Sequence, residues 1–190
     1  MDFTNSIANS ILIIEDSEDD FYITERTFTK AGLMNKLVRV KTGDEALDFL
    51  FCRGAYSGNT KTDQPGIILL DLKLPGISGQ EVLAQIKADP KLRKIPVVVS
   101  TGSEDPDDID MCYRAGANGY INKPINVENF IQSIMRLKDY WFQVNVLPKR
   151  KGFSNDKSRA QSLAKQRPNS ELNWALSYRS NLVVSQIGLL

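Results

Sequence analysis

The sequence predicts an α/β protein built as a (βα)5 doubly wound, open parallel sheet. Five short and largely apolar runs alternate with five helical patterns over the first 142 residues. Two of these runs, Ile11–Ile14 and Ile67–Leu70, are apolar at every position, which is typical of parallel strands covered on both faces. Right-handed helical crossovers between such strands produce a doubly wound sheet. The 42% of hydrophobic and 25% of charged residues fit a globular domain.

Five strands are expected at the apolar runs. The first is Ile11–Ile14, and the second is Leu37–Val40, which contains one arginine. The third is Ile67–Leu70, which is apolar throughout. Residues 96–100 and 120–122 complete the set. Because a helical pattern follows each run, the order of elements is strand then helix, repeated five times.

The first three helices carry start or stop signals. Residues 19–31 form a helical pattern that ends at Gly32, a residue that favours helix C-termini. Thr42 and Ser78 are each followed three residues later by glutamate, which is the signature of a capping box. These signals predict helices over the segments that follow the first, second and third strands.

Two further helices follow the fourth and fifth strands. Asp105 and Pro106 supply an N-cap and a first-turn proline, and the helix that they open is expected to end at Gly116. Asn126 is expected to cap the last helix. The inward face of this last helix is predicted from its apolar spacing to be Phe130, Ile131, Ile134, Met135 and Leu137.

The residue content excludes several classes of site. The chain has no histidine, so a Ser-His-Asp triad, a Cys-His dyad and a histidine-containing zinc site are all ruled out. The two cysteines, Cys52 and Cys112, are too few for a disulfide framework, and we interpret them as buried or inert thiols. Any chemistry must therefore rest on carboxylates, lysine, hydroxyls or a metal ion held by oxygen.

Neither a membrane span nor a secretion signal is predicted. No run approaches the ~18 apolar residues of a membrane span. The first ten residues lack the basic start and apolar run of a signal peptide. We therefore expect a cytoplasmic protein with no membrane partner.

The charge divides the chain into unequal segments. Residues 1–148 hold 16 basic and 21 acidic residues, a net charge of −5, whereas residues 149–190 hold 8 and 2, a net charge of +6. We predict an N-terminal segment over 1–9, one domain over 10–148, and a basic, mostly disordered tail over 149–190. The tail is too short for a recognisable DNA-binding module, so a solvated tail is preferred to a nucleic-acid partner.

Polar residues follow the predicted strands where a doubly wound sheet binds its ligands. Glu15 and Asp16 end the first strand, Asp71 the third and Thr101 the fourth, while Lys123 follows the fifth. The carboxyl ends of parallel strands meet at one edge of the sheet, so these side chains are expected to lie together. Three adjacent carboxylates repel one another, and oxygen ligands of this kind suit Mg²⁺.

The same residues suit phosphoryl transfer. An ionised carboxylate such as Asp71 can attack phosphorus and form an acyl phosphate. Lys123 and Mg²⁺ would offset the negative charge on the phosphoryl oxygens, and the Thr101 hydroxyl would donate a hydrogen bond.

With these residues in this order, the sequence resembles the receiver domain of two-component response regulators. Glu15-Asp16 resembles the acidic pair of that family, Asp71 falls on its phosphoacceptor, and Lys123 stands at its Lys-Pro step. Thr101 matches the switch hydroxyl and Tyr120 the switch aromatic. The resemblance implies a flavodoxin-like receiver fold and a signalling protein rather than an enzyme.

The resemblance also implies a ligand set. It places Mg²⁺ on Glu15, Asp16, Asp71 and the backbone carbonyl of Lys73. It places the phosphoryl group beside Thr101, Gly102 and Lys123. A lysine two residues after the phosphoacceptor departs from the family pattern as we know it, with an effect on dephosphorylation whose sign the sequence leaves open.

Three longer sequence segments resemble a narrower group within this family. The segments LLDLKLPGISGQEVL, IPVVVSTGSEDPDDI and DYWFQVNVLP are similar to small single-domain regulators paired with bacterial and cyanobacterial phytochromes. This similarity implies a sensor histidine kinase of the phytochrome type as the partner. It also implies a homodimer that forms through the fourth and fifth helices.

Several alternatives stay open on the sequence. Tyr120 also fits an ordinary strand aromatic, and Thr101 a turn hydroxyl. The aspartyl-phosphate chemistry also suits a phosphohydrolase, although no insertion is large enough for a cap domain. A third hypothesis is an adaptor protein that uses the receiver fold without being phosphorylated.

Overall fold

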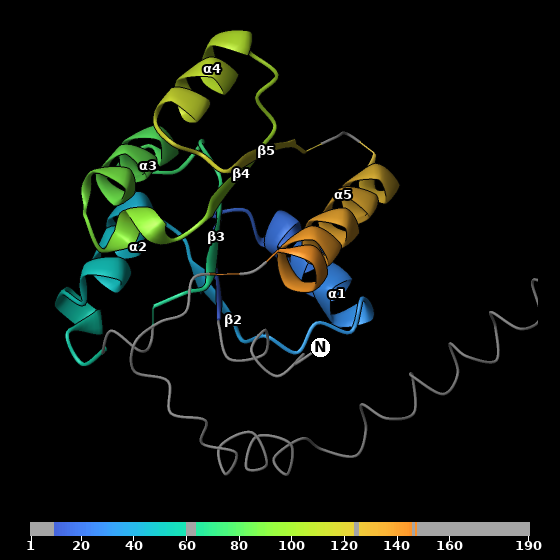
Figure 1. Ribbon diagram of the computed structural model, residues 1–190, viewed down its shortest axis with the longest axis horizontal. Helices are drawn as coiled ribbons and strands as arrows, with labels where there is room; N and C mark the ends of the chain where they lie inside the picture. Colours follow the sequence, from blue (N-terminus) through green and yellow to red (C-terminus); the bar gives the residue numbers. More distant parts are fainter. Residues whose placement is uncertain (1–9, 60–63, 124–125, 146, 148–190) are drawn as a thin grey trace, which may run out of the picture. The chain divides into compact units, whose positions relative to one another are not determined.

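Five parallel strands form one sheet, in the spatial order β2-β1-β3-β4-β5. The computed structural model describes residues 10–59, 64–123, 126–145 and 147 (Figure 1). The segments predicted over 1–9 and 149–190 lie outside the described residues, and the domain boundaries expected at 10 and 148 stay predictions. The strands are β1 (Ile11–Ile14), β2 (Leu37–Val40), β3 (Ile67–Leu70), β4 (Val97–Thr101) and β5 (Gly119–Asn122).

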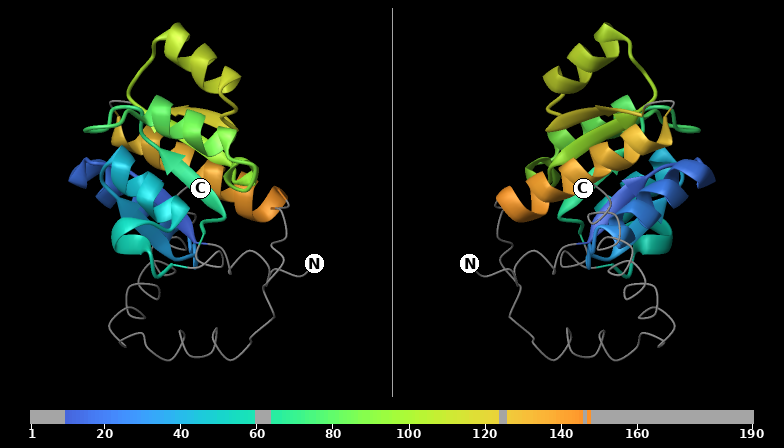
Figure 2. Two further views of the ribbon diagram at one scale, coloured as in Figure 1. Left: turned by 90° about the vertical axis from the view of Figure 1, so that its left-hand side faces the viewer. Right: turned by 90° about the vertical axis from the view of Figure 1, so that its right-hand side faces the viewer.

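A helix follows each strand, so the predicted (βα)5 order is confirmed. The helices are α1 (Glu18–Lys30), α2 (Gly43–Phe51), α3 (Gly79–Ala88), α4 (Pro106–Arg114) and α5 (Val127–Asp139). Figures 1 and 2 show α1 and α5 together on one side of the sheet, with α2 and α3 on the other. A π-helical turn, Tyr140–Val144, extends α5.

The three central strands β1, β3 and β4 are buried on both faces, as the unbroken apolar sequences of β1 and β3 predict, whereas the edge strands β2 and β5 are mostly half-buried. In β1, Leu12 and Ile14 belong to the core beneath α2, α3 and α4, whereas Ile11 and Ile13 belong to the core beneath α1 and α5. All four side chains are at most 3% exposed. Burying an isoleucine or leucine side chain contributes about 1.5–3 kcal/mol, so this strand is a central source of stability.

Helix caps set where each strand-to-helix loop ends. The first helix begins at Glu18, one residue before the predicted start, because the Ser17 side chain accepts a hydrogen bond from the Asp20 amide. Ser78 forms the complete capping box that its sequence predicts. The box predicted at Thr42 is only half formed, because the Glu45 carboxylate accepts from the Lys41 amide and the Tyr56 hydroxyl instead.

The prediction for the inward face of α5 is wrong at Met135. Phe130, Ile134 and Leu137 are buried against the sheet, whereas Met135 is exposed and Ile131 is only half-buried. The buried face continues through Trp141 in the π-helical turn. Spacings of four, three and four residues keep this stripe on one side of the helix, and Met135 lies outside it.

The described helices differ from membrane-spanning segments. Among the residues described, no helix is both long enough and apolar enough to cross a bilayer.

Candidate functional site

Four strands deliver polar side chains to one edge of the sheet. Glu15 follows β1, Asp71 follows β3, Thr101 is the last residue of β4, and Lys123 follows β5. The parallel registers bring these strand ends together, with Ile14 paired to Leu70. The sheet therefore assembles residues that are as far apart as 108 positions in the sequence.

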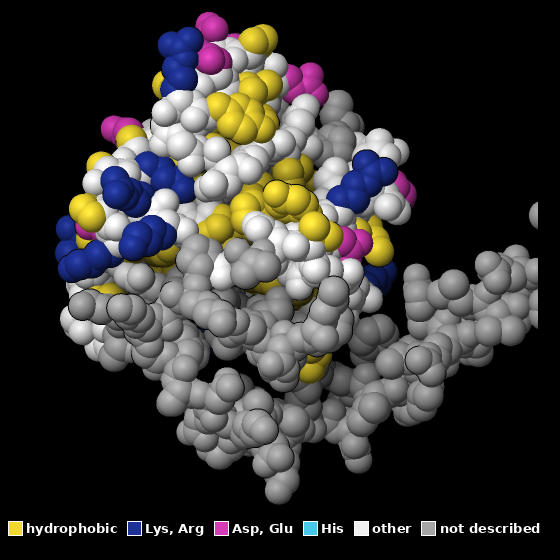
Figure 3. Space-filling model, viewed as in Figure 1, with side chains coloured by type: hydrophobic (Ala, Val, Ile, Leu, Met, Phe, Trp, Pro, Cys, Tyr) yellow, Lys and Arg dark blue, Asp and Glu magenta, His cyan; other side chains and the backbone are white. Residues whose placement is uncertain are grey.

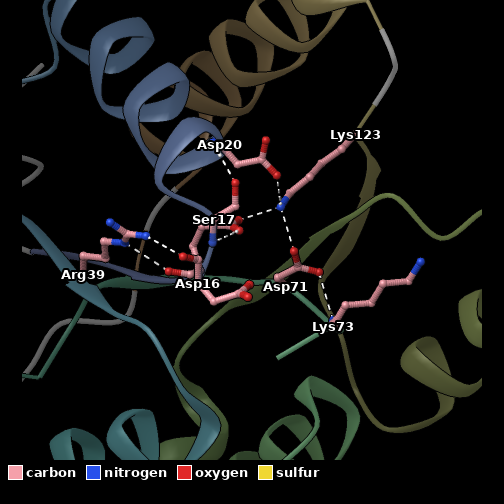
Figure 4. Close-up of polar contacts among 8 residues, drawn as sticks. Asp16, Ser17, Asp20, Arg39, Asp71, Lys73 and Lys123 are labelled. Atoms are coloured by element: carbon pink, nitrogen blue, oxygen red, sulfur yellow. Dashed lines mark hydrogen bonds and ion pairs between the residues drawn. The ribbon is translucent and has the colours of Figure 1, made fainter. Parts of the chain in front are cut away.

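Lys123 is the centre of this cluster. Its Nζ atom lies 2.6 Å from Glu15 Oε2, 2.7 Å from Asp71 Oδ2 and 2.8 Å from Asp20 Oδ2 (Figure 4). The three donors of one ammonium group are thus shared among three carboxylates. Because one positive charge faces three negative charges, the cluster can accept a further cation.

A metal ion would have a suitable donor set here. Glu15, Asp16 and Asp71 each offer a carboxylate oxygen, and these oxygens lie within 4.8 Å of one another. Glu15 and Asp71 are buried, while Asp16 is exposed and leaves an approach open to water. Buried and exposed oxygen ligands in one cluster match the preference of Mg²⁺, which keeps several waters.

The second oxygen of Asp71 is held by the backbone. The Lys73 amide donates to Asp71 Oδ1 at 3.1 Å. Figure 4 shows the Lys73 side chain extending away from Asp71, so its backbone rather than its ammonium faces this carboxylate. Gly79, the first residue of α3, packs so closely that a Cβ atom there would lie 2.0 Å from the Asp71 carbonyl oxygen.

The site shifts the proton affinity of its ionisable groups. Burial raises the pKa of Glu15 from 4.5 to about 7, and the negative charges of Asp71 and Asp20 add to this, against the opposing attraction of Lys123. Burial disfavours the charged form of Lys123, but Glu15, Asp20 and Asp71 outweigh it and raise the pKa of the ammonium. The lysine is therefore permanently charged, whereas Glu15 exchanges its proton near neutral pH.

Thr101 supplies a buried hydroxyl at the end of β4. The residue is 0% exposed, and its Oγ1 atom has no hydrogen-bond partner among the described residues. A buried hydroxyl without a partner costs about 1–3 kcal/mol. A group that arrives at the strand end and accepts a hydrogen bond would remove this cost.

Tyr120 is linked to the loop after β4. Its hydroxyl donates to the Ser103 carbonyl at 2.9 Å. The Ser103 hydroxyl donates to Asp108 in α4 at 2.5 Å, and Gln80 in α3 donates to the same carboxylate at 2.7 Å. Gly102 is exposed, and a side chain there would meet nothing within 4 Å. The loop therefore connects β5 with the starts of α3 and α4.

Two residues of the cluster were missed by sequence reasoning. Asp20 follows directly after Asp19, and nothing in the sequence separates the two acids. Arg39 lies within an otherwise apolar strand, and its guanidinium contacts the loop of Glu15 and Asp16 (Figure 4). The unusual signal was a charged residue within a strand of the sheet.

Comparison with known proteins shows which family of sequences this chain resembles. The sequence model of the response regulator receiver domain matches residues 11–135. The response regulator Rcp1 of a Synechocystis strain is 34% identical over 138 residues, which are 73% of this chain and 92% of that protein.

Solved structures agree with the sequence match. The Mn²⁺-bound form of Rcp1 superposes with a TM-score of 0.70 at 33% identity, over 74% of this chain and 99% of that one. The phosphorylated cyanobacterial phytochrome response regulator RcpA has the same TM-score and coverage at 35% identity. The bacteriophytochrome response regulator RtBRR has a TM-score of 0.60 at 32% identity, over 89% and 95% of the two chains.

Proposed function

The chain belongs to the response regulator receiver domain family, and we propose that it accepts a phosphoryl group on Asp71 from a sensor histidine kinase. It then signals through altered protein contacts, as a regulator rather than an enzyme. The family supplies the class of signalling protein, and the residues at the strand ends supply the proposed chemistry.

The observation that carries the proposal is the pairing of Lys123 with Asp71 at the strand ends, together with the buried hydroxyl of Thr101 at the end of β4. Lys123 Nζ lies 2.7 Å from Asp71 Oδ2, and Thr101 Oγ1 is buried without a partner among the described residues. A phosphoryl group on Asp71 would bring oxygens that accept from both. A carboxylate, a fixed ammonium and a free hydroxyl are the groups that formation of an acyl phosphate requires.

The transfer proceeds by in-line displacement at phosphorus. An oxygen of the Asp71 carboxylate forms the new P–O bond as the P–N bond to the kinase phosphohistidine breaks, and the imidazole leaves with that electron pair. Lys123 neutralises charge on the phosphoryl oxygens, while Thr101 and the Gly102 backbone contact them. When bound by Glu15, Asp16, Asp71 and the Lys73 carbonyl, Mg²⁺ supplies additional positive charge to the same oxygens.

The conformational change spreads from the site through the loop that follows β4. When Thr101 turns to the phosphoryl group, the loop that carries Ser103 moves with it. Tyr120 and Asp108 are hydrogen-bonded to Ser103, so a shift of this loop reaches β5 and α4. Thr101 and Tyr120 are thus the switch residues of the proposal.

The proposed partners follow from the relatives and from the surface. RcpA and RtBRR are phytochrome response regulators by name, which supports a phytochrome-type kinase in the cytoplasm as the phosphoryl donor. Exposed apolar side chains on α4 and at the end of α5 support a homodimer through these helices. Figure 3 shows hydrophobic side chains over α4. Met111 and Tyr113 of α4, Met135 of α5 and Tyr140 in the π-helical turn after it are exposed.

The test is a titration with beryllofluoride, which mimics a phosphoryl group on aspartate. Wild type and Asp71→Asn are titrated with and without Mg²⁺, and binding is followed by fluorine NMR while light scattering reports the mass. We expect saturable, Mg²⁺-dependent binding that Asp71→Asn abolishes, with a rise in mass if the output is a dimer. Absent binding in folded wild type would replace the proposal with the phosphorylation-independent adaptor.

A further inference from the structure

We infer that Arg39 is a positioning residue that holds Glu15 and Asp16 in the conformation required to bind a divalent cation. The inference rests on the proposed function, because it concerns the metal site that supports phosphoryl transfer. It assigns a role to a residue in β2, outside the set at the carboxyl ends of the other four strands.

Glu15 and Asp16 are adjacent in sequence, yet their carboxylates lie at the same site. Side chains that follow one another along an extended strand point to opposite faces. Both residues nevertheless place a carboxylate oxygen within 4.8 Å of Asp71 and of each other. The two residues lie between the end of β1 at Ile14 and the N-cap Ser17 of α1, so this short loop must be held in one conformation for both oxygens to meet Asp71.

Arg39 binds the backbone of both residues. Its Nε atom donates to the Glu15 carbonyl and a terminal nitrogen donates to the Asp16 carbonyl, both at 3.0 Å. One planar guanidinium thus binds two successive carbonyls and restrains the backbone that carries both carboxylates. Its other terminal nitrogen contacts the carboxylate of Glu18, the first residue of α1.

The guanidinium is itself held in place. Arg39 pairs in register with Ile13 of β1, and its Cζ atom lies 4.6 Å from the centre of the Phe21 ring in α1. Its side chain is only 12% exposed, whereas the neighbouring Lys41, which also pairs with Glu18, is 57% exposed. A guanidinium that is stacked and largely buried is a rigid support for the loop.

Charge and position predict opposite effects for the loss of Arg39. A positive charge near the acidic pair repels a bound cation, so an electrostatic role predicts tighter Mg²⁺ binding when the arginine is removed. A positioning role predicts weaker binding, because the carboxylates lose their alignment. Removal of residues that orient metal ligands typically weakens metal binding about 10–100-fold.

The test measures Mg²⁺ binding to the full chain by isothermal titration calorimetry. Arg39→Gln removes the charge and the fork of donors, and Arg39→Lys keeps the charge but loses the fork. Lys41→Gln is the matched control, because it removes a positive charge that pairs with the same Glu18 at 2.6 Å. Circular dichroism and thermal unfolding of each variant confirm that it is folded at the titration temperature.

We expect both Arg39 variants to raise the dissociation constant for Mg²⁺ about 10-fold or more, and Lys41→Gln to leave it unchanged or lower it. Arg39→Gln that binds Mg²⁺ as tightly as wild type, or Arg39→Lys that matches it, would overturn the inference. If Arg39→Gln fails to fold, the dissociation constant of Arg39→Lys for Mg²⁺, compared with that of wild type, tests the inference. Failure of the wild type to bind Mg²⁺ would instead remove the proposed metal site, and the inference with it.

Discussion

The ammonium of Lys123 lies 2.7 Å from the carboxylate of Asp71, a residue 52 positions earlier in the chain. The same ammonium also contacts Glu15 and Asp20, so a single lysine balances a group of three acids. Because of this imbalance of charge, binding of a cation or a proton at the site would stabilise the metal-free protein.

Loss of Lys123 should destabilise the metal-free protein. In Lys123→Met, the buried carboxylates of Glu15 and Asp71 face each other without a cation, and removal of one partner from a buried ion pair costs about 3–5 kcal/mol. Urea unfolding at pH 8 measures this loss, and added Mg²⁺ should restore part of it. The control is Arg114→Gln, which breaks an exposed pair with Asp110 and should change stability by at most about 0.5 kcal/mol. Equal losses in the two variants would contradict the prediction.

Binding of Mg²⁺ should release a proton in the window set by Glu15. Its pKa is about 7 in the folded protein and 4.5 as the ordinary value. Between these values the unfolded chain has lost the proton that the folded site retains, so the contribution of Glu15 to the free energy of unfolding falls as the pH rises. Because a bound cation needs the carboxylate, Mg²⁺ affinity should rise from pH 6 to pH 8.

Calorimetry in two buffers of different ionisation enthalpy measures that proton. Release should be substantial at pH 6 and small at pH 8. Asp110→Asn is a suitable comparison, because it removes an exposed acid that pairs with Arg114 in α4 and leaves the cluster of Glu15, Asp16 and Asp71 intact. Proton release that is the same at both pH values would rule out Glu15 as the titrating ligand.

Replacement of Thr101 should stabilise the resting protein but weaken its binding of beryllofluoride. In Thr101→Val, a buried hydroxyl without a partner among the described residues becomes a methyl group. The resting protein should be more stable by about 1 kcal/mol, because no hydrogen bond is lost and a polar group is no longer buried. Beryllofluoride affinity should fall, because the donor to the phosphoryl oxygens is gone.

Urea unfolding and fluorine NMR measure the two effects separately. Thr101→Ser is the control, since it keeps the hydroxyl and should retain most of the beryllofluoride affinity. A loss of resting stability in Thr101→Val, or unchanged beryllofluoride affinity, would show that the hydroxyl has a structural partner rather than a phosphoryl ligand.

Close packing at Gly79 should control the position of Asp71. A Cβ atom at Gly79 would lie 2.0 Å from the Asp71 carbonyl oxygen and 2.6 Å from Leu72 Cα, so Gly79→Ala must displace α3 or the strand end. We expect a loss of about 1–3 kcal/mol in stability, together with weaker Mg²⁺ binding. Gly58→Ala, at an exposed glycine with nothing within 4 Å of the added atom, should change neither. Unaltered Mg²⁺ binding in folded Gly79→Ala would show that Asp71 tolerates the shift.

The elements of this protein are determined locally by its sequence. Apolar runs without alternation predict β1 and β3, and Ser78 and Asn126 act as helix caps where their side chains predict. The rule that ligands bind at the carboxyl ends of parallel strands places Asp71 at the correct edge of the sheet. These conclusions need only neighbours within about four residues and a general rule of topology.

The tertiary structure decided which side chains meet. It selected Asp20 rather than Asp19 as the third partner of Lys123, left Thr101 without a partner among the described residues, and placed Arg39 against the carbonyls of the acidic pair. It also left Met135 exposed on a helix whose spacing had suggested burial. Sequence periodicity assigns a residue to a face, but contacts between charged groups depend on distances between elements remote in the chain. Those distances arise only when the sheet and its helices pack together.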